Sequence, residues 1–175
     1  MHTVLKKAIF IGSLLVVGVQ PVFAQELERA KEGTLACVGN HELRRGGTET
    51  TFTSYNFRNF NADNAITITN ITIYDADGVV LKDMPGRDPF PPAPDFISVI
   101  GPNQTSNFNT QDVFGNGNIP GPVRTPLQMI VRWGATERGA ALYGSAARQD
   151  RGRDPAGGNN LEQRARSLVR CVSLK

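Results

Sequence analysis

Two aspartates separated by one residue, Asp75 and Asp77, open the stretch of this sequence that is best suited to bind a metal ion. Gly78 follows them, and a calcium loop of the EF-hand type can begin in this way. Such a loop needs a further oxygen ligand two residues on and a glutamate at its twelfth position, but Val79 and Gly86 occupy these places. Asp-Gly between apolar runs is also a strong hairpin signal. The sequence therefore predicts a hairpin turn, with a weak calcium site completed by other loops as the alternative.

Histidine chemistry would depend on His41, because the other histidine, His2, lies in a segment that we expect to be removed. No GxSxG motif or equivalent supplies a nucleophile for His41. Met84 and Met129 do not belong to the Met-rich or His-rich cluster that a copper carrier would need. A surface histidine is the simpler interpretation. We therefore expect no enzyme activity, no cofactor and no metal, with a hydrolase of unrecognised site as the alternative.

Arginines gather in the last third of the chain. Residues 121–175 carry ten basic and four acidic side chains, whereas residues 25–120 carry seven basic and twelve acidic ones. Guanidinium groups bind phosphate, sulfate and carboxylate bidentately, which suggests a polysaccharide, lipopolysaccharide or nucleic acid as ligand. The alternative is a solvated face whose arginines pair with neighbouring acids, since residues 25–175 have a formal charge of only +1. The candidate anion-binding residues are Arg148, Arg151, Arg153, Arg164, Arg166 and Arg170.

The first residues of the chain indicate its compartment. Lys6 and Lys7 precede a short apolar run over residues 8–19, and Val22-Phe23-Ala24 provides the residues that a signal peptidase recognises. We expect residues 1–24 to be a cleaved signal peptide, with an uncleaved anchor as the alternative. The apolar run is shorter than the roughly 20 residues that a membrane span needs. The pattern therefore predicts an exported protein, periplasmic or extracellular, with no membrane span after cleavage.

The two cysteines of the chain, Cys37 and Cys171, lie near opposite ends of the segment that remains. In an exported protein an even number of cysteines favours a disulfide. A metal site with two cysteines is the competing interpretation, but the chain has no CxxC motif. We expect a Cys37–Cys171 bond that fastens the first strand to the last.

The candidate side chains described above must be positioned by short strands, which are separated by turns of Gly, Pro, Asn and Asp. Four isoleucines at positions 66, 68, 71 and 73 change parity between the second and the third. One extra residue near Thr69-Asn70 is therefore expected as a β-bulge, with a strand buried on both faces as the alternative. In "LQMIVRW", Trp133 completes an apolar face and is expected in the core. Residues 25–33 have the composition of a short helix, and 161–165 are expected to form a helical turn before a strand through Cys171.

Proline and glycine mark two long connections. Residues 83–95 hold five of the eleven prolines, and we expect this stiff segment to cross from one sheet to another. Residues 115–122 form a glycine-rich loop. Both segments could present contacts to a partner without any catalytic group.

About seven such strands and no long amphipathic helix predict an all-β protein, a single antiparallel sandwich over residues 34–175. In general shape, its strands, turns and Trp133 resemble the immunoglobulin-like β-sandwich of bacterial exported proteins, over roughly residues 34–174. The resemblance does not extend to that family's cysteine pair around the tryptophan, because Cys37 and Cys171 fall in the terminal strands. We therefore expect a non-catalytic binding or structural module for a protein or cell-envelope partner, recognised through loops or a sheet edge.

Overall fold

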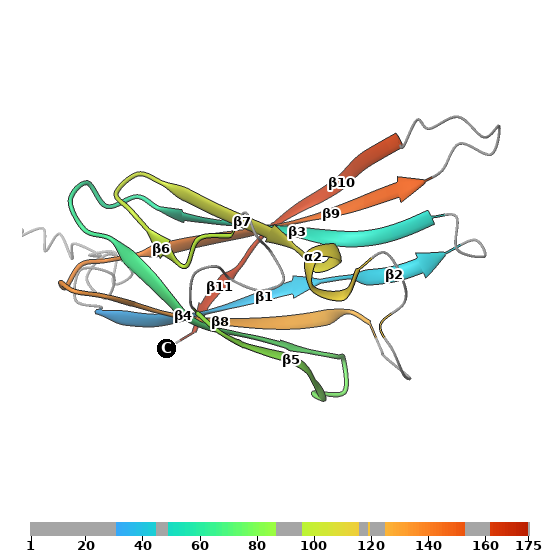
Figure 1. Cartoon of the computed structure of the whole chain (residues 1–175), viewed down its shortest axis with the longest axis horizontal. Helices are drawn as coiled ribbons and strands as arrows, with labels where there is room; N and C mark the ends of the chain where they lie inside the picture. The colour runs from blue at the N-terminus through green and yellow to red at the C-terminus, as the bar shows by residue number, and fades with distance from the viewer. Residues whose placement is uncertain are drawn as a thin grey trace, which may run out of the picture.

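The computed structural model of the chain describes residues 31–44, 49–86, 96–115, 119, 125–152 and 162–174. The expected signal peptide, residues 25–30 of the expected N-terminal helix and Arg153 lie outside them. The helix is wrong for Glu32 and Gly33, which belong to a strand. The described residues form two sheets and one short helix (Figure 1). The elements are β1 (Glu32–Gly39), β2 (His41–Arg44), β3 (Glu49–Asn59), β4 (Ile66–Tyr74), β5 (Val80–Pro85), β6 (Val99–Ile100), β7 (Thr105–Asn109), α2 (Thr110–Phe114), β8 (Leu127–Ala135), β9 (Leu142–Gly152), β10 (Glu162–Arg170) and β11 (Val172–Leu174).

The strands form two antiparallel sheets, which confirms the predicted all-β sandwich. Sheet A has the order β11-β1-β8-β4-β5, and β6 also pairs with β4. Sheet B has the order β10-β9-β3-β2, and β7 also pairs with β3. Figure 1 shows that β9 and β10 diverge from β8 and β5 toward one end of the molecule. Toward that end the interior of the sandwich contains buried polar residues, among them Thr51, Thr53 and Asp150.

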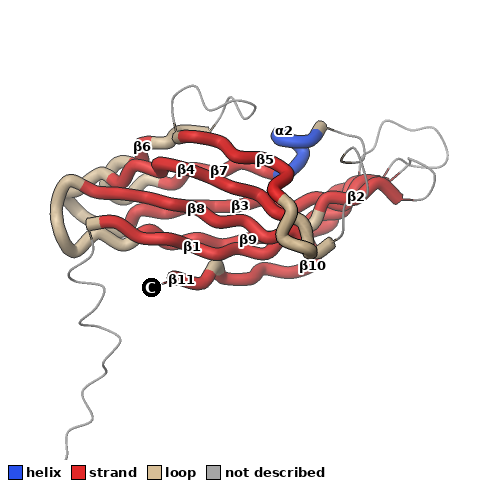
Figure 2. Tube along the Cα trace, turned by 90° about the horizontal axis from the view of Figure 1, so that it is seen from below, coloured by secondary structure: helices blue, strands red, loops and turns tan. Residues whose placement is uncertain are grey.

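Both terminal strands change sheets, which is one reason why the described residues contain more than the expected seven strands. β1 lies in sheet A, and after Asn40 the chain continues as β2 in sheet B. β10 lies in sheet B, and after Cys171 the chain continues as β11 in sheet A. Figure 2 shows β11 along the border of sheet A, close to the C-terminus. Each terminal strand therefore connects the two sheets.

The core is built by alternation along these strands, and the predicted β-bulge is confirmed. All four isoleucines of β4 are fully buried, although their parity changes within the strand. The pairing of β4 with β8 shifts register between Ile68 and Asn70, which returns the later isoleucines to the inner face. Trp133 is buried in the same cluster, as its place in the apolar face of β8 predicts.

The hairpin between β4 and β5 is also confirmed. One carboxylate oxygen of Asp75 accepts hydrogen bonds from the backbone N–H groups of Asp77 and Val79, both at 2.9 Å. Gly78 has φ 83°, the left-handed conformation that glycine adopts most readily. The Asp75 carboxylate is buried and stabilises the turn through these two hydrogen bonds.

The expectation for the proline-rich segment is wrong. β5 and β6, the strands on either side of residues 87–95, both pair with β4 in sheet A. The chain passes from sheet A to sheet B later, between β6 and β7, through a turn in which Asn103 has φ 58°. The chain therefore leaves β4 after β5 and comes back to the same edge of β4 with β6. This is possible because β4 is long enough to pair with both strands along that edge.

The expected helical turn at residues 161–165 is wrong as well. Residues 162–170 form β10, which pairs with β9 along its length and has a register shift between Ala165 and Ser167. The helix in the described residues is α2, and it begins with a reciprocal capping box. The side chain of Asn109 accepts from the backbone of Asp112, whose carboxylate accepts from the backbone of Asn109.

The predicted disulfide is present. Cys37 in β1 and Cys171 between β10 and β11 are bonded, with a sequence separation of 134. The backbone N–H of Cys171 donates to the carbonyl of Gly144 in β9, which keeps the corner against sheet B. The bond therefore closes the sandwich where the last strand passes from one sheet to the other.

Candidate functional site

The inner face of sheet B changes from apolar to polar toward one end of the sandwich. Tyr55 in β3 is completely buried, and the next inward residue of that strand is Thr53, which lies opposite Arg148 in β9. The following inward pair is Thr51 and Asp150. Because inward positions normally carry apolar side chains, this row of polar residues is the first candidate for a functional site.

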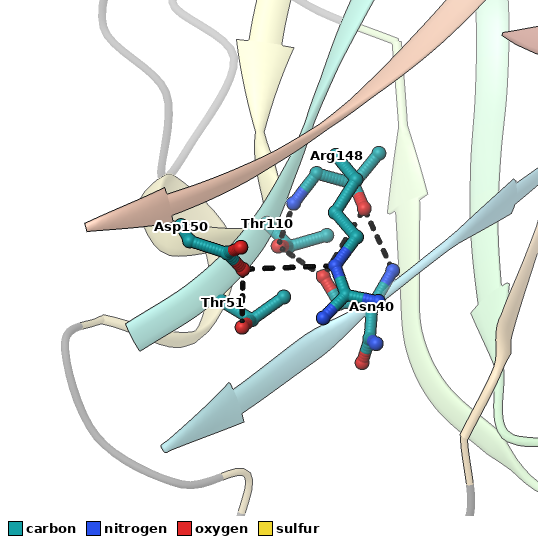
Figure 3. Close-up of polar contacts among 6 residues, drawn as sticks. Asn40, Thr51, Thr110, Arg148 and Asp150 are labelled. Atoms are coloured by element: carbon teal, nitrogen blue, oxygen red, sulfur yellow. Dashed lines mark hydrogen bonds and ion pairs between the residues drawn. The ribbon is translucent and has the colours of Figure 1, made fainter. Parts of the chain in front are cut away.

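Arg148 and Asp150 form an ion pair inside this end. The Arg148 Nε lies 3.6 Å from a carboxylate oxygen of Asp150, and the same oxygen accepts a 2.7 Å hydrogen bond from the hydroxyl of Thr51 (Figure 3). The Asp150 side chain is 5% exposed and that of Arg148 is 32% exposed. The acid is thus enclosed while the guanidinium reaches toward solvent, so the pair neutralises the charge of the site.

A single hydroxyl closes a gap in sheet B next to this pair. β2 pairs with β3 up to Phe52, and β7 pairs with it from Ser54 on, so Thr53 has no strand partner on that edge. The hydroxyl of Thr110, the first residue of α2, accepts the backbone N–H of Thr53 at 3.1 Å and donates to the carbonyl of Asn40 at 3.1 Å. The helix therefore completes the hydrogen bonding where the sheet is interrupted.

His41 is buried, so the expectation of a surface histidine is wrong. It is 3% exposed, its ring lies 5.4 Å from that of Phe114, and its Nδ1 lies 3.2 Å from the Thr110 hydroxyl. The Thr110 proton goes to a carbonyl, so Nδ1 must be the donor in this contact. The threonine and the histidine are both enclosed, and the arrangement joins α2 to β2 without presenting a nucleophile to solvent.

A cavity of about 200 Å³ lies beside this polar row, between the two sheets. Its apolar walls come from Val38, Pro126, Ala146 and Val169, and its polar groups from Asn40, Thr53 and Arg148. Val38 and Val169 are 51% and 44% exposed, so they border the opening. The cavity therefore opens between β1, which carries Val38, and β10, which carries Val169.

The six predicted anion-binding arginines do not share one environment. Arg148 faces inward, whereas Arg151 belongs to the opposite face of β9 and lies 5.8 Å above the ring of Phe52. Arg170 is exposed and lies 5.0 Å above the ring of Tyr143. Of the others, Arg153 lies outside the described residues, while residues 164 and 166 are described only as backbone of β10.

A basic and aromatic cluster on the outer face of sheet B includes one of these arginines. Arg58 lies opposite Tyr143 in the pairing of β3 with β9, and its guanidinium is 4.7 Å above the ring of Phe60. The rings of Phe60 and Tyr143 are 5.7 Å apart, edge to face. Neither Arg58 nor Arg170 has an acidic partner among the described residues, so both keep their donors for solvent or a ligand.

The strands at the border carry exposed apolar side chains, which we call the apolar edge: Val38, Leu168, Val169, Val172 and Leu174. Leu168 is 73% exposed and Val172 is 63% exposed. Val172 and Leu174 lie opposite Ala36 and Thr34 of β1, on the same outer face as Val38. Edge strands are usually protected by charged residues or proline, and β11 has neither.

Other chemistry in the described residues is limited. No group of three or more histidine, cysteine or acidic side chains is arranged to hold a metal ion within the described ranges. Burial raises the pKa of Tyr55 far above its ordinary value, which makes its phenol a packing group and not a base. No helix among the described residues is long and apolar enough to span a bilayer.

Sequence reasoning missed the apolar edge, the role of Arg58 and the cavity. The sequence shows the apolar residues of 168–174, but only the strand pairing shows that they lie in β10 and β11, at the edges of the two sheets. Arg58 is separated from Arg170 by more than 100 positions, so no local cluster of charge announces the pair. Comparison of the chain with protein-family models, with curated proteins and with solved structures finds no match.

Proposed function

We propose that the mature chain is an exported, non-catalytic binding module that recognises a protein partner of the cell envelope through the apolar edge. The proposal rests on one observation. The last two strands, β10 and β11, are edge strands of sheet B and sheet A, and they expose Leu168, Val172 and Leu174. A sheet border offers unpaired backbone groups, and apolar side chains on it add burial energy when an extended partner segment pairs there. The disulfide fits the oxidising compartment that the expected signal peptide implies.

Site-specific photo-crosslinking tests the proposal in the exporting cell. A photoreactive phenylalanine analogue at position 172 should yield adducts of discrete mass, because that side chain lies within the proposed interface. The same analogue at Val80, an exposed valine of β5 at the opposite edge of sheet A, is the matched control. Equal adducts at both positions, or none at 172, would contradict the proposal. Leu174→Lys should weaken the adduct at 172 without lowering the melting temperature, since residue 174 is on the surface.

A second candidate function has its own observation. The guanidinium groups of Arg58 and Arg170 lie over the rings of Phe60 and Tyr143 and have no acidic partner among the described residues. This arrangement suits the bidentate binding of sulfate or phosphate on an anionic polymer.

Heparin chromatography at low salt tests this second candidate. Retention should fall steeply as salt rises and should be lost in Arg58→Gln/Arg170→Gln, because polymer binding releases counterions. Arg132→Gln is the matched control, since Arg132 is exposed on the outer face of sheet A. Failure of the parent protein to bind heparin, or equal loss in the control, would exclude the outer face of sheet B as the site.

A further inference from the structure

The outer face of sheet B carries a row of polar side chains that crosses four strands. Asn56 of β3 lies opposite Asn107 of β7 on one side and Ser145 of β9 on the other, and Ser145 lies opposite Arg170 of β10. Residues directly opposite one another in antiparallel strands point to the same face of the sheet. The four strands belong to one layer (Figure 1), so the row runs across the sheet from β7 to β10.

This row is open to solvent. Asn107 and Arg170 are exposed, and Asn56 and Ser145 are partly exposed. The side chains of Asn56, Asn107 and Ser145 make no hydrogen bond within the described part of the chain, so their polar groups are available to a ligand. Amides and hydroxyls both donate and accept hydrogen bonds, as the hydroxyls of a sugar do. The row therefore suits a ligand that is rich in hydroxyl groups.

The basic and aromatic cluster lies in the next row of the same face. Arg58 is opposite Thr105 of β7 and Tyr143 of β9. Phe60 is 57% exposed, so its ring still offers apolar surface to solvent although the guanidinium of Arg58 lies over it. A sugar ring is polar around its rim and apolar on its C–H faces, which can pack against an aromatic ring. The two rows together thus present hydrogen-bonding groups, ring surface and two cations.

The charge of the two rows selects an acidic ligand of low charge density. Both charged side chains in these rows, Arg58 and Arg170, are basic. They are two strands and two residues apart, which corresponds to about 12 Å between their Cα atoms in a regular sheet. A strand of B-DNA carries a phosphate every 3.4 Å or about that, so most of its phosphates would face amides and hydroxyls here. A polysaccharide with acidic groups on separate sugars matches the cations and the polar groups between them.

We propose that these two rows form a binding site for an acidic polysaccharide that bears carboxylates on separate sugars. The inference rests on the second candidate function, and it adds the class of polymer and the residues that would bind it. Arg58 and Arg170 each pair with one carboxylate, whose two oxygens match the planar guanidinium. Asn56, Asn107 and Ser145 exchange hydrogen bonds with hydroxyls of the sugars between the two carboxylates.

Three oligomers of equal length test the inference on the mature, disulfide-bonded protein. A hyaluronan hexasaccharide has a carboxylate on every second sugar, its carboxyl-reduced form is neutral, and a thymidylate hexamer has a phosphate between all neighbouring units. In ¹⁵N–¹H correlation spectra at physiological salt, the hyaluronan probe should shift the amides of Asn56, Tyr143 and Ser145 and should saturate. The other two probes should bind at least about tenfold more weakly. Equal or tighter binding of either, or no saturable shift with hyaluronan, would overturn the inference.

Variants in the polar row separate the recognition of sugar hydroxyls from simple charge attraction. Asn56→Ala and Ser145→Ala should each lower the affinity for the hyaluronan probe about three- to tenfold, because a hydrogen bond to the ligand is lost. Gln128→Ala is the matched control, since Gln128 is exposed on the outer face of sheet A, and it should bind as the parent does. The melting temperatures of the three variants should equal that of the parent. Unchanged affinity in both Asn56→Ala and Ser145→Ala would overturn the inference.

Heparin chromatography distinguishes this inference from the function on which it rests. Retention that is lost in Arg58→Gln/Arg170→Gln, together with no preference for hyaluronan over its reduced form or over thymidylate, would keep the outer face of sheet B as an anion-binding surface and overturn the polysaccharide assignment. Failure of the parent protein to bind heparin would exclude both.

Discussion

The phenol oxygen of Tyr55 occupies the space that a Cβ on Gly39 would need. Gly39 is the last residue of β1, and Tyr55 reaches it from the opposite sheet, so the two sheets are in direct contact at this point. Tyr55 is completely buried. The absence of a side chain at position 39 is therefore a packing requirement.

Gly39→Ala should lower the free energy of unfolding by about 1–3 kcal/mol, because the added methyl overpacks the interior. Urea denaturation measures the effect. Gly134→Ala is the matched control in another strand, where the added Cβ would meet nothing closer than 3.9 Å. In a Tyr55→Phe background the same Gly39→Ala change should cost less, since the phenol oxygen is gone. An equal cost in both backgrounds would show that the contact is not the cause.

Thr110→Val should destabilise the protein by about 1–3 kcal/mol, because the backbone N–H of Thr53 and the carbonyl of Asn40 would lose their partner in a buried place. Thr110→Ser retains the hydroxyl and should keep most of the stability. Chemical denaturation of the three proteins gives the comparison. A loss in the serine variant with none in the valine variant would assign the effect to the methyl group instead.

Replacing Cys37 and Cys171 together with alanine should lower stability by up to about 5 kcal/mol, the value that the chain-entropy relation gives for a closed loop of 134 residues. The measurement is the midpoint of denaturation of the variant beside that of the oxidised parent. Peptide mapping without reductant should first recover the linked pair from the exported parent. Two free thiols in that material would contradict the structure.

Asp83 should titrate below the usual range of an aspartate. Hydrogen bonds from the side chains of Asn70 and Thr72 lower its pKa, with Asn70 the larger cause. A folded-state pKa below the unfolded one adds stability above the unfolded value of about 3.9, and this stability is lost as pH falls through the folded pKa. The destabilisation caused by Asp83→Asn at pH 6 should therefore shrink toward pH 2.

Carbon-detected NMR titration of the Asp83 carboxyl measures that pKa directly. Asn70→Ala should raise it toward the ordinary value, and Thr72→Val should raise it by less. An unaltered midpoint in Asn70→Ala would show that this amide does not hold the carboxylate in solution.

The sequence allowed prediction where one side-chain pattern had one physical solution. Four buried isoleucines with a change of parity require a bulge, and Asp75 with Gly78 requires a tight turn, so both were predictable. The segment 161–170 fitted a helical and a strand period equally, and only its pairing with β9 decides between them. His41 is buried because α2, a helix of five residues, covers it, and no local signal foretold that packing. Asn40 and Arg148, which both line the cavity, are more than 100 residues apart in the sequence, so a linear pattern could not reveal it.

The Cys37–Cys171 bond has a mechanical consequence. Tension applied between the two ends of the chain passes from β1 through the disulfide directly to Cys171, between β10 and β11. The 134 residue steps between the cysteines, about 450 Å of extended polypeptide, are bypassed and cannot be drawn out while the bond is oxidised. A partner that pulls on β11 against an anchored N-terminus would stretch only the few residues outside the bridge. The sandwich itself would bear the load without lengthening.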